Sequence, residues 1–318
     1  MSEPLRDINL NNLDRQHFDF WQPPAGHVIH VGAEQQPVLL PQIPLPLKRK
    51  SEDEFNPSDN AIGEGLYDYL RQFPDCLHNT DYAYLLRQAY THYLADLAAQ
   101  VVLLDAKDVE PAYVLRKLTY LKILRLLEPE NTGLLWQLCR GFYGLAMTFA
   151  ELPAARSHLL DAMRFGQNLV KLDPGNSSAL NLLAEIDILF GDYPAAVTKL
   201  QRLLEIVSDR QLAEHIKSRL EVCIATGFPG HPLVDDLEAI GAAMQLYAAK
   251  EYRMATELLE RLEEDEYFMA ELKSADFLCL LGLCRQKTGD RGGAFDALSQ
   301  AIEMAPDHEQ AREALQSI

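Results

Sequence analysis

The stretch from residue 275 to residue 308, ADFLCLLGLCRQKTGDRGGAFDALSQAIEMAPDH, decides the fold of this chain. Gly289 interrupts a helical pattern at its centre, since glycine accepts the backbone angles of a tight turn. Pro306 ends the pattern, because proline lacks the backbone donor that a helix needs. The apolar residues on either side of the turn recur every three or four positions: Leu278, Leu281 and Cys284 before it, and Ala294, Leu298 and Ala301 after it.

These features predict two antiparallel helices that pack closely. Gly282 and Ala294 have little or no side chain, so the two helix backbones can approach each other there. Such a pair leaves apolar surface at both ends, which a neighbouring pair must cover. The pattern therefore predicts a stack of helix pairs.

The stretch resembles a tetratricopeptide repeat (TPR) in its 34-residue length, its Leu281-Gly282 step, its turn at Gly289, its small residue at Ala294 and its closing Pro306. The resemblance implies an all-α fold, a right-handed superhelical stack of antiparallel helix pairs. It also implies a protein-binding scaffold, with partners held on the concave face that the first helix of each pair lines.

Composition narrows the class of protein. Across 318 residues the chain is 48% hydrophobic and 24% charged, as expected of a folded protein, and its net charge is −18. Such an acidic chain is not expected to bind nucleic acid or anionic membranes, which attract basic patches. No apolar run is long enough to span a membrane.

The cysteines point to a reducing compartment. Their number is odd, their spacing is irregular and no CxxC motif occurs. Four of the five lie in apolar helical patterns, whereas Cys76 falls in a segment between helices. The opening sequence MSEPLRDINLNNLDR has no apolar core of a signal peptide, so we expect a cytoplasmic protein.

Residues 1–60 form a first segment, which is rich in proline. HVIHV (27–31) alternates as a short strand does, and PVLLPQIPLPL (37–47) is apolar but interrupted by proline, so it should be extended. Two interpretations stay open. The segment is a partly disordered tail, or its apolar part docks on the protein itself or on a partner.

Residues 61–226 form a second, divergent TPR-like segment. We expect a short helix over 61–72, one long helix from about 79 to 105, and another that begins at Pro111 and ends before Pro129. Helix pairs then follow over 132–176 and 177–208, and a single helix spans 210–225. The first of these pairs is longer than a standard repeat.

Residues 233–318 form the third segment, which follows the breaker GFPGHP (227–232). We expect two TPR pairs, over 236–266 and 275–308, and a capping helix over 309–317. In the first pair Lys250 stands where the turn glycine is usual. The acidic run LERLEEDE (259–266) is expected to be a solvated helix end.

No pattern of an enzyme or a metal site is present. The sequence lacks GxxxxGK[ST], HExxH and GxSxG, and no GxGxxG follows a strand. The pair His27 and His30 has spacing that suits a helix better than the expected strand, so we expect no metal there. We therefore expect no catalysis and no cofactor.

The candidate binding residues come from the concave positions that the resemblance implies. Most are apolar, and the Lys, Asn and Arg clamp by which some TPRs hold a peptide carboxylate is absent. Another protein or peptide is the expected partner, unless the helix over 210–225 or the proline-rich segment covers the face. The candidates are Leu237, Ile240, Met244, Tyr247, Leu283, Gln286 and Lys287.

Two other functions stay open. LLEPENTGLLW (126–136) loosely resembles the helical repeats of protein prenyltransferase alpha subunits, which would imply a non-catalytic scaffold subunit of an enzyme complex. Alternatively, the repeat faces serve self-assembly, and the sequence does not fix the oligomeric state.

Overall fold

The computed structural model describes residues 17–31, 35–49, 57–105, 110–225 and 231–318. It divides into two compact units, residues 1–138 and residues 139–318, called here the N-terminal and C-terminal units. The division falls inside helix α5 (Thr132–Ala146). Elements on the two sides of residue 60 contact each other within the N-terminal unit, and elements on the two sides of residues 227–232 contact each other within the C-terminal unit.

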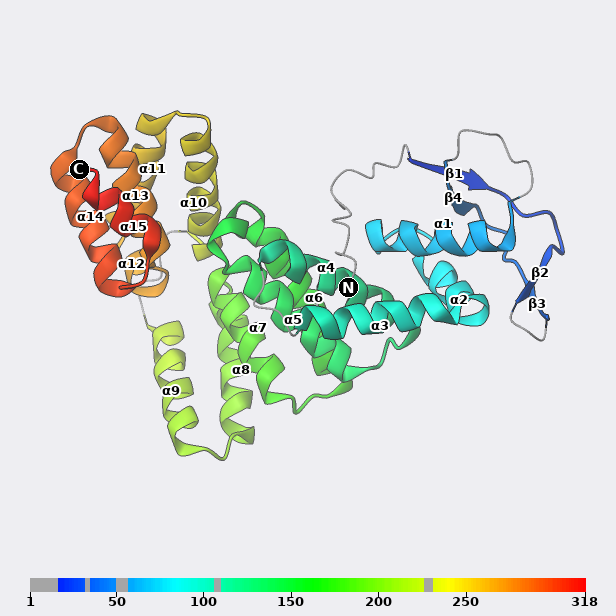
Figure 1. Ribbon diagram of the computed structural model, residues 1–318. Helices are drawn as coiled ribbons and strands as arrows, with labels where there is room; N and C mark the ends of the chain where they lie inside the picture. Colours follow the sequence, from blue (N-terminus) through cyan, green and yellow to red (C-terminus); the bar gives the residue numbers. More distant parts are fainter. Residues whose placement is uncertain (1–16, 32–34, 50–56, 106–109, 226–230) are drawn as a thin grey trace. The chain divides into compact units, whose positions relative to one another are not determined.

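The proline-rich segment of the N-terminal unit forms two small antiparallel sheets (Figure 1). Strand β1 (Phe18–Trp21) pairs with β4 (Leu45–Lys48), and β2 (Val28–Val31) pairs with β3 (Gln36–Leu39). The strand expected at 27–31 is therefore confirmed. The expected partly disordered tail includes residues 1–16, 32–34 and 50–56, and these lie outside the described residues.

The apolar part of this segment docks on the protein itself. Strand β4 packs along helix α1 (Asp59–Gln72), and both Leu40 and Leu45 are buried. The contact is close, since a Cβ atom on Gly65 would lie 2.1 Å from the backbone oxygen of Pro46. For PVLLPQIPLPL, docking on the protein replaces the alternative of a free tail.

The long helix expected from 79 to 105 is broken at Tyr90, which corrects the sequence prediction. Helix α2 (Asn79–Ala89) ends there and α3 (Thr91–Asp105) begins. The residue is non-helical at φ −136°, and its hydroxyl donates to the backbone oxygen of Asp59 at 2.6 Å. Its ring also covers Gly63, where a Cβ atom would lie 2.6 Å away. The break therefore follows from a contact with α1, which local sequence does not encode.

Helix α4 (Pro111–Leu127) completes the described helices of the N-terminal unit before α5, with proline in its first turn as predicted. It packs against both α2 and α3. Both helices expected in this region are therefore present, the first of them in two pieces.

The C-terminal unit is a series of helix pairs that follow one another along the chain (Figure 1). The helices that it contains after α5 are α6 (Ala155–Leu172), α7 (Ser177–Leu189), α8 (Tyr193–Ile206), α9 (Arg210–Ile224), α10 (Leu233–Ala248), α11 (Tyr252–Glu263), α12 (Glu266–Glu271), α13 (Ala275–Thr288), α14 (Arg291–Met304) and α15 (Glu309–Gln316). A 3₁₀ helix, η3 (Phe149–Ala154), lies between α5 and α6.

Local chemistry explains where the last repeat begins and turns. The Ser274 hydroxyl accepts from the backbone N–H of Phe277 and caps α13. Gly289 ends that helix in the left-handed region at φ +94°, and the Asp290 carboxylate caps α14 by accepting from Gly293. The expected turn and both expected helices are confirmed.

Two features of the pair formed by α10 and α11 were harder to predict from the sequence than those of α13 and α14. Lys250 takes the turn position of the missing glycine and adopts φ +66° itself. The acidic run after it does not simply end in solvent, because Asp265 caps the short helix α12 and Phe268 of that helix is fully buried.

Candidate functional site

The predicted binding residues lie on α10 and α13, the first helices of two consecutive pairs, but they differ in exposure. Leu237 is only 4% exposed and Ile240 only 2%, so neither side chain is available to a partner in this conformation. Part of the reason is η3 and α6, which pack against α10. At Gly241 the approach is close enough that a Cβ atom would lie 2.7 Å from the backbone nitrogen of Pro153.

Met244, Tyr247 and Leu283 are half-buried and keep part of their surface accessible. Burial raises the pKa of the Tyr247 hydroxyl, and Cys284, Tyr252 and Cys279 add to the shift. The ring centroid also lies 5.3 Å from that of Tyr252. Helices α10 and α13 contact each other, so these partly buried residues lie on neighbouring helices.

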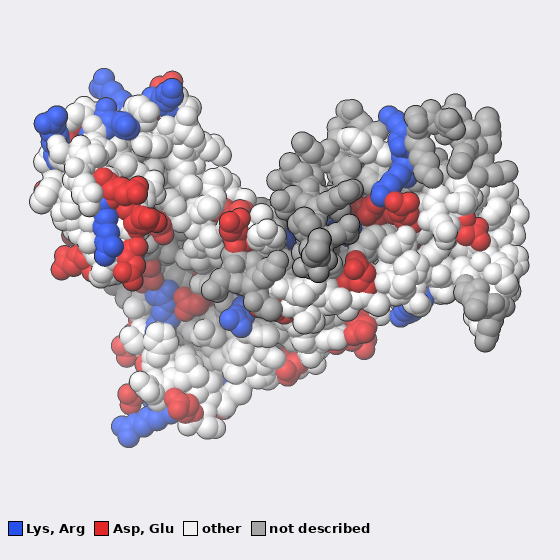
Figure 2. Space-filling view, viewed as in Figure 1, with Lys and Arg blue, Asp and Glu red and all other residues white. Residues whose placement is uncertain are grey.

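The two polar candidates lie in the last turn of α13. The Gln286 side-chain amide donates to the Ser317 hydroxyl at 2.9 Å, so part of its hydrogen-bonding capacity serves the fold. Lys287 is exposed. Figure 2 shows Lys and Arg side chains gathered at the end of the C-terminal unit where α10 turns into α11 and α13 into α14, and the exposed residues of these turns include Lys250 and Arg291.

Helix α9 is held in the unit by Arg219. Its guanidinium donates to both carboxylate oxygens of Glu185 on α7 and to both of Glu271 on α12, at 2.8–3.3 Å. All three side chains are about four-fifths buried. The pKa of the Arg219 guanidinium is raised because these two carboxylates outweigh its desolvation, which favours the neutral form. Both carboxylate oxygens of Glu185 are therefore engaged within the fold.

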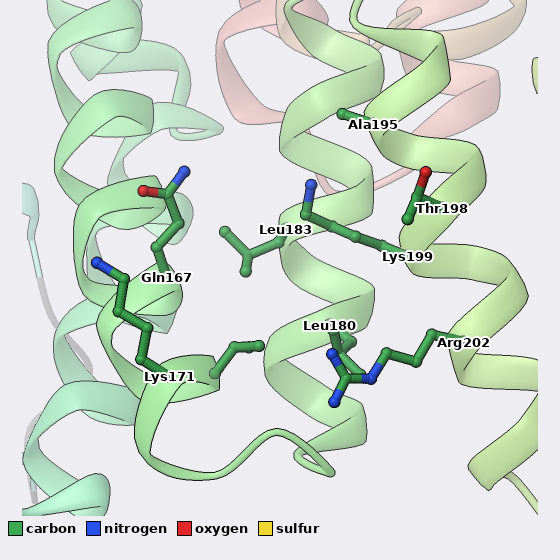
Figure 3. Close-up of a pocket in the computed structure, with 9 residues that line it drawn as sticks. Gln167, Lys171, Leu180, Leu183, Ala195, Thr198, Lys199 and Arg202 are labelled. Atoms are coloured by element: carbon green, nitrogen blue, oxygen red, sulfur yellow. The ribbon is translucent and has the colours of Figure 1, made fainter.

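A pocket of about 500 Å³ opens over α6, α7 and α8, and sequence reasoning missed it (Figure 3). Its floor includes the buried side chains of Leu180 and Leu183. Figure 3 shows Lys199 and Arg202 extending from α8 over α7, while Lys171 extends along α6 on the opposite rim. The pocket is lined by Gln167, Val170, Lys171, Leu180, Leu183, Ala195, Thr198, Lys199 and Arg202.

The cysteines are packing residues, as expected. Cys139, Cys223, Cys279 and Cys284 are buried and unpaired, and Cys76 is partly exposed. Burial raises the pKa of the Cys139 and Cys284 thiols to about 12, so both are protonated at neutral pH. Among the residues that the structure describes, no three His, Cys, Asp or Glu side chains group as a metal site would require. Over the same residues, no helix has the length and apolar character of a membrane span.

Comparison with known proteins gives matches in structure only. No protein-family model and no curated protein matches the sequence. The TPR domain of P58(IPK) aligns with a TM-score of 0.34 and 17% identity, over 80% of this chain and 63% of that domain. YrrB, described as a TPR protein with an unusual peptide-binding site, aligns at 0.27 and 14% identity, over 80% of this chain and 99% of its own. TTC0263 of Thermus thermophilus, also a TPR protein, aligns at 0.26 and 16%, over 70% and 97%.

These scores are too low to support an argument about function, and the chain spans less than two thirds of the P58(IPK) domain. The classification follows from the chain's own helix pairs. Helices α13 and α14 have 14 residues each, turn at a left-handed glycine and meet closely at Gly282. Helices α7 and α8 repeat this plan, with Gly191 at φ +73° in the turn. The C-terminal unit therefore has a TPR-like fold of stacked helix pairs.

Proposed function

We propose that the protein is a non-catalytic interaction scaffold that binds a segment of another protein on the surface formed by α10 and α13. One observation carries this proposal: Met244 and Tyr247 on α10 and Leu283 on α13 are each only partly buried, and the two helices contact each other. Aromatic and methionine side chains with accessible apolar surface are typical of protein-binding sites.

The charge nearby suggests what the partner segment carries. Lys287 stands exposed one turn beyond Leu283, at the end of the unit where Lys and Arg gather in Figure 2. A segment with one or two apolar side chains followed by an acidic residue would complement this surface. Leu237 and Ile240 then support the site from beneath instead of contacting the partner.

Site-specific photo-crosslinking tests the proposal. A benzoylphenylalanine placed at Met244 should form a discrete crosslink with a partner protein in cells, and one at the exposed Glu214 of α9 should not. The crosslink at Met244 should weaken when Lys287 is replaced by Glu, an exposed substitution that leaves the core intact. Identical products from both positions, or none from Met244, would contradict the proposal.

A further inference from the structure

The pocket over α6, α7 and α8 lies on different residues from the α10 and α13 surface. It is framed by the second helices of two consecutive pairs, and its floor is Leu180 and Leu183. We propose that this pocket binds an acidic segment of a partner protein, with an apolar side chain on the floor and a neighbouring carboxylate at Arg202 and Lys171.

The rim is basic in a strongly acidic chain. None of the residues that line the pocket is Asp or Glu, although the chain carries a net charge of −18. Lys199 does not contribute free charge, because its ammonium pairs with Asp187, which is 5% exposed. That pair fixes the position of α8 on α7. Within the described part of the chain neither Lys171 nor Arg202 forms an ion pair, so both charges are available.

Geometry favours a carboxylate on this rim. The planar guanidinium of arginine presents parallel N–H donors that match the two oxygens of a carboxylate. In Figure 3 Arg202 lies over α7 near Leu180, so a carboxylate bound to it would stand beside the apolar floor. Lys171 and Gln167 are exposed on the facing helix and can add donors from the other side.

The floor favours a peptide over a small anion. Val170 and Ala195 are partly exposed above the buried Leu180 and Leu183, and they provide apolar contacts that inorganic phosphate cannot use. A cavity of about 500 Å³ also has room for a whole aliphatic or aromatic side chain together with its neighbouring carboxylate. Nucleic acid would need a longer basic surface than two free charges, and the acidic chain would repel its backbone.

Methyl spectroscopy of the full-length protein tests this assignment. With ¹³C-methyl-labelled leucines, the acetylated and amidated peptide Gly-Asp-Leu-Glu-Gly should shift the methyl signals of Leu180 and Leu183 in a saturable way. Two matched peptides separate the contributions: Gly-Asn-Leu-Gln-Gly lacks the carboxylates, and Gly-Asp-Ser-Glu-Gly lacks the apolar side chain. Both should bind at least tenfold more weakly than the first peptide.

Substitutions at the rim test whether its basic side chains bind the peptide. The double substitution R202Q and K171Q should weaken binding of the first peptide at least tenfold, while R210Q with K217Q on exposed positions of α9 should leave it unchanged. A second variant, T198E, adds a carboxylate at the rim and should also weaken binding. The proposal is overturned if the first peptide leaves the two leucines unshifted, if the amide peptide binds equally, if the double rim variant binds normally, or if inorganic phosphate alone reproduces the shifts.

The two proposals fail independently. The peptide experiment reads the methyls of α7, whereas the crosslink at Met244 reads α10. If Met244 crosslinks as expected but the peptide leaves the methyl signals of Leu180 and Leu183 unshifted, only the proposal for the pocket is contradicted.

Discussion

A Cβ atom on Gly282 would lie 2.6 Å from Cγ of Leu298, so the glycine is what allows α13 and α14 to pack. Alanine favours a helix interior over glycine by about 1 kcal/mol, but overpacking a fully buried contact costs about 1–3 kcal/mol. Since Leu298 is completely buried and its Cγ cannot swing away, G282A should lower the free energy of unfolding.

Chemical denaturation checks this prediction against a matched variant. Gly144 lies inside α5 with nothing within 4 Å of its added Cβ, so G144A should be neutral or stabilising by up to about 1 kcal/mol. If both variants were stabilised alike, close packing at Gly282 would be refuted.

A glycine at position 250, in the turn between α10 and α11, should stabilise the folded protein. Lys250 adopts φ +66°, a left-handed conformation that costs a residue with a side chain about 1 kcal/mol. K250G should therefore raise the midpoint of urea unfolding slightly. G289A, at φ +94° in the corresponding turn of the last repeat, should lower it. Equal effects of the two substitutions would show that backbone conformation does not govern these turns.

Arg219 should matter more to stability than an exposed arginine on the same helix. R219M leaves Glu185 and Glu271 largely buried without their shared cation, at an expected cost of about 2–4 kcal/mol after allowance for partial exposure. R210M removes an arginine that is 93% exposed and should change the unfolding midpoint little. Faster amide exchange in α9 should accompany the first change, and unchanged exchange would contradict the role of Arg219 as an anchor.

Asp236 should give the C-terminal unit a specific pH dependence. Burial raises the pKa of this carboxyl above 3.8, partly offset by the hydrogen bond to His231. The folded state therefore holds the proton more strongly than the unfolded chain, and stability from this group falls as pH rises from 3.8 through the folded pKa. In urea unfolding between pH 3.5 and 7, D236N should gain stability relative to the unmodified protein as pH rises. Parallel curves would rule the effect out.

The sequence predicted those parts of the fold that local chemistry encodes. The last repeat was predictable because Ser274, Gly289 and Asp290 mark its helix ends in the chain itself. The strand at 27–31 was predictable from alternation, although its pairing with β3 was not. The break at Tyr90 was missed because its cause is a contact with Gly63 of another helix.

The candidate site could also be predicted only in part, because it depends on contacts between distant parts of the chain. Repeat positions led to α10 and α13, but they could not show that Leu237 and Ile240 are buried, since η3 and α6 come from about 80 residues earlier in the chain. The pocket was missed because Lys171 and Arg202 look like ordinary surface charges until α6 and α8 are placed on either side of α7.

The central claim is that the surface of α10 and α13 holds a partner segment. Its most direct test is the affinity, by titration calorimetry, of the segment that crosslinks to Met244. Replacing Tyr247 by Ser should weaken binding at least tenfold, because it removes a partly exposed aromatic ring from the proposed surface, whereas R202Q in the separate pocket should change it less than twofold. Unaltered affinity of the Tyr247→Ser variant, with its fold intact by circular dichroism, would contradict the account.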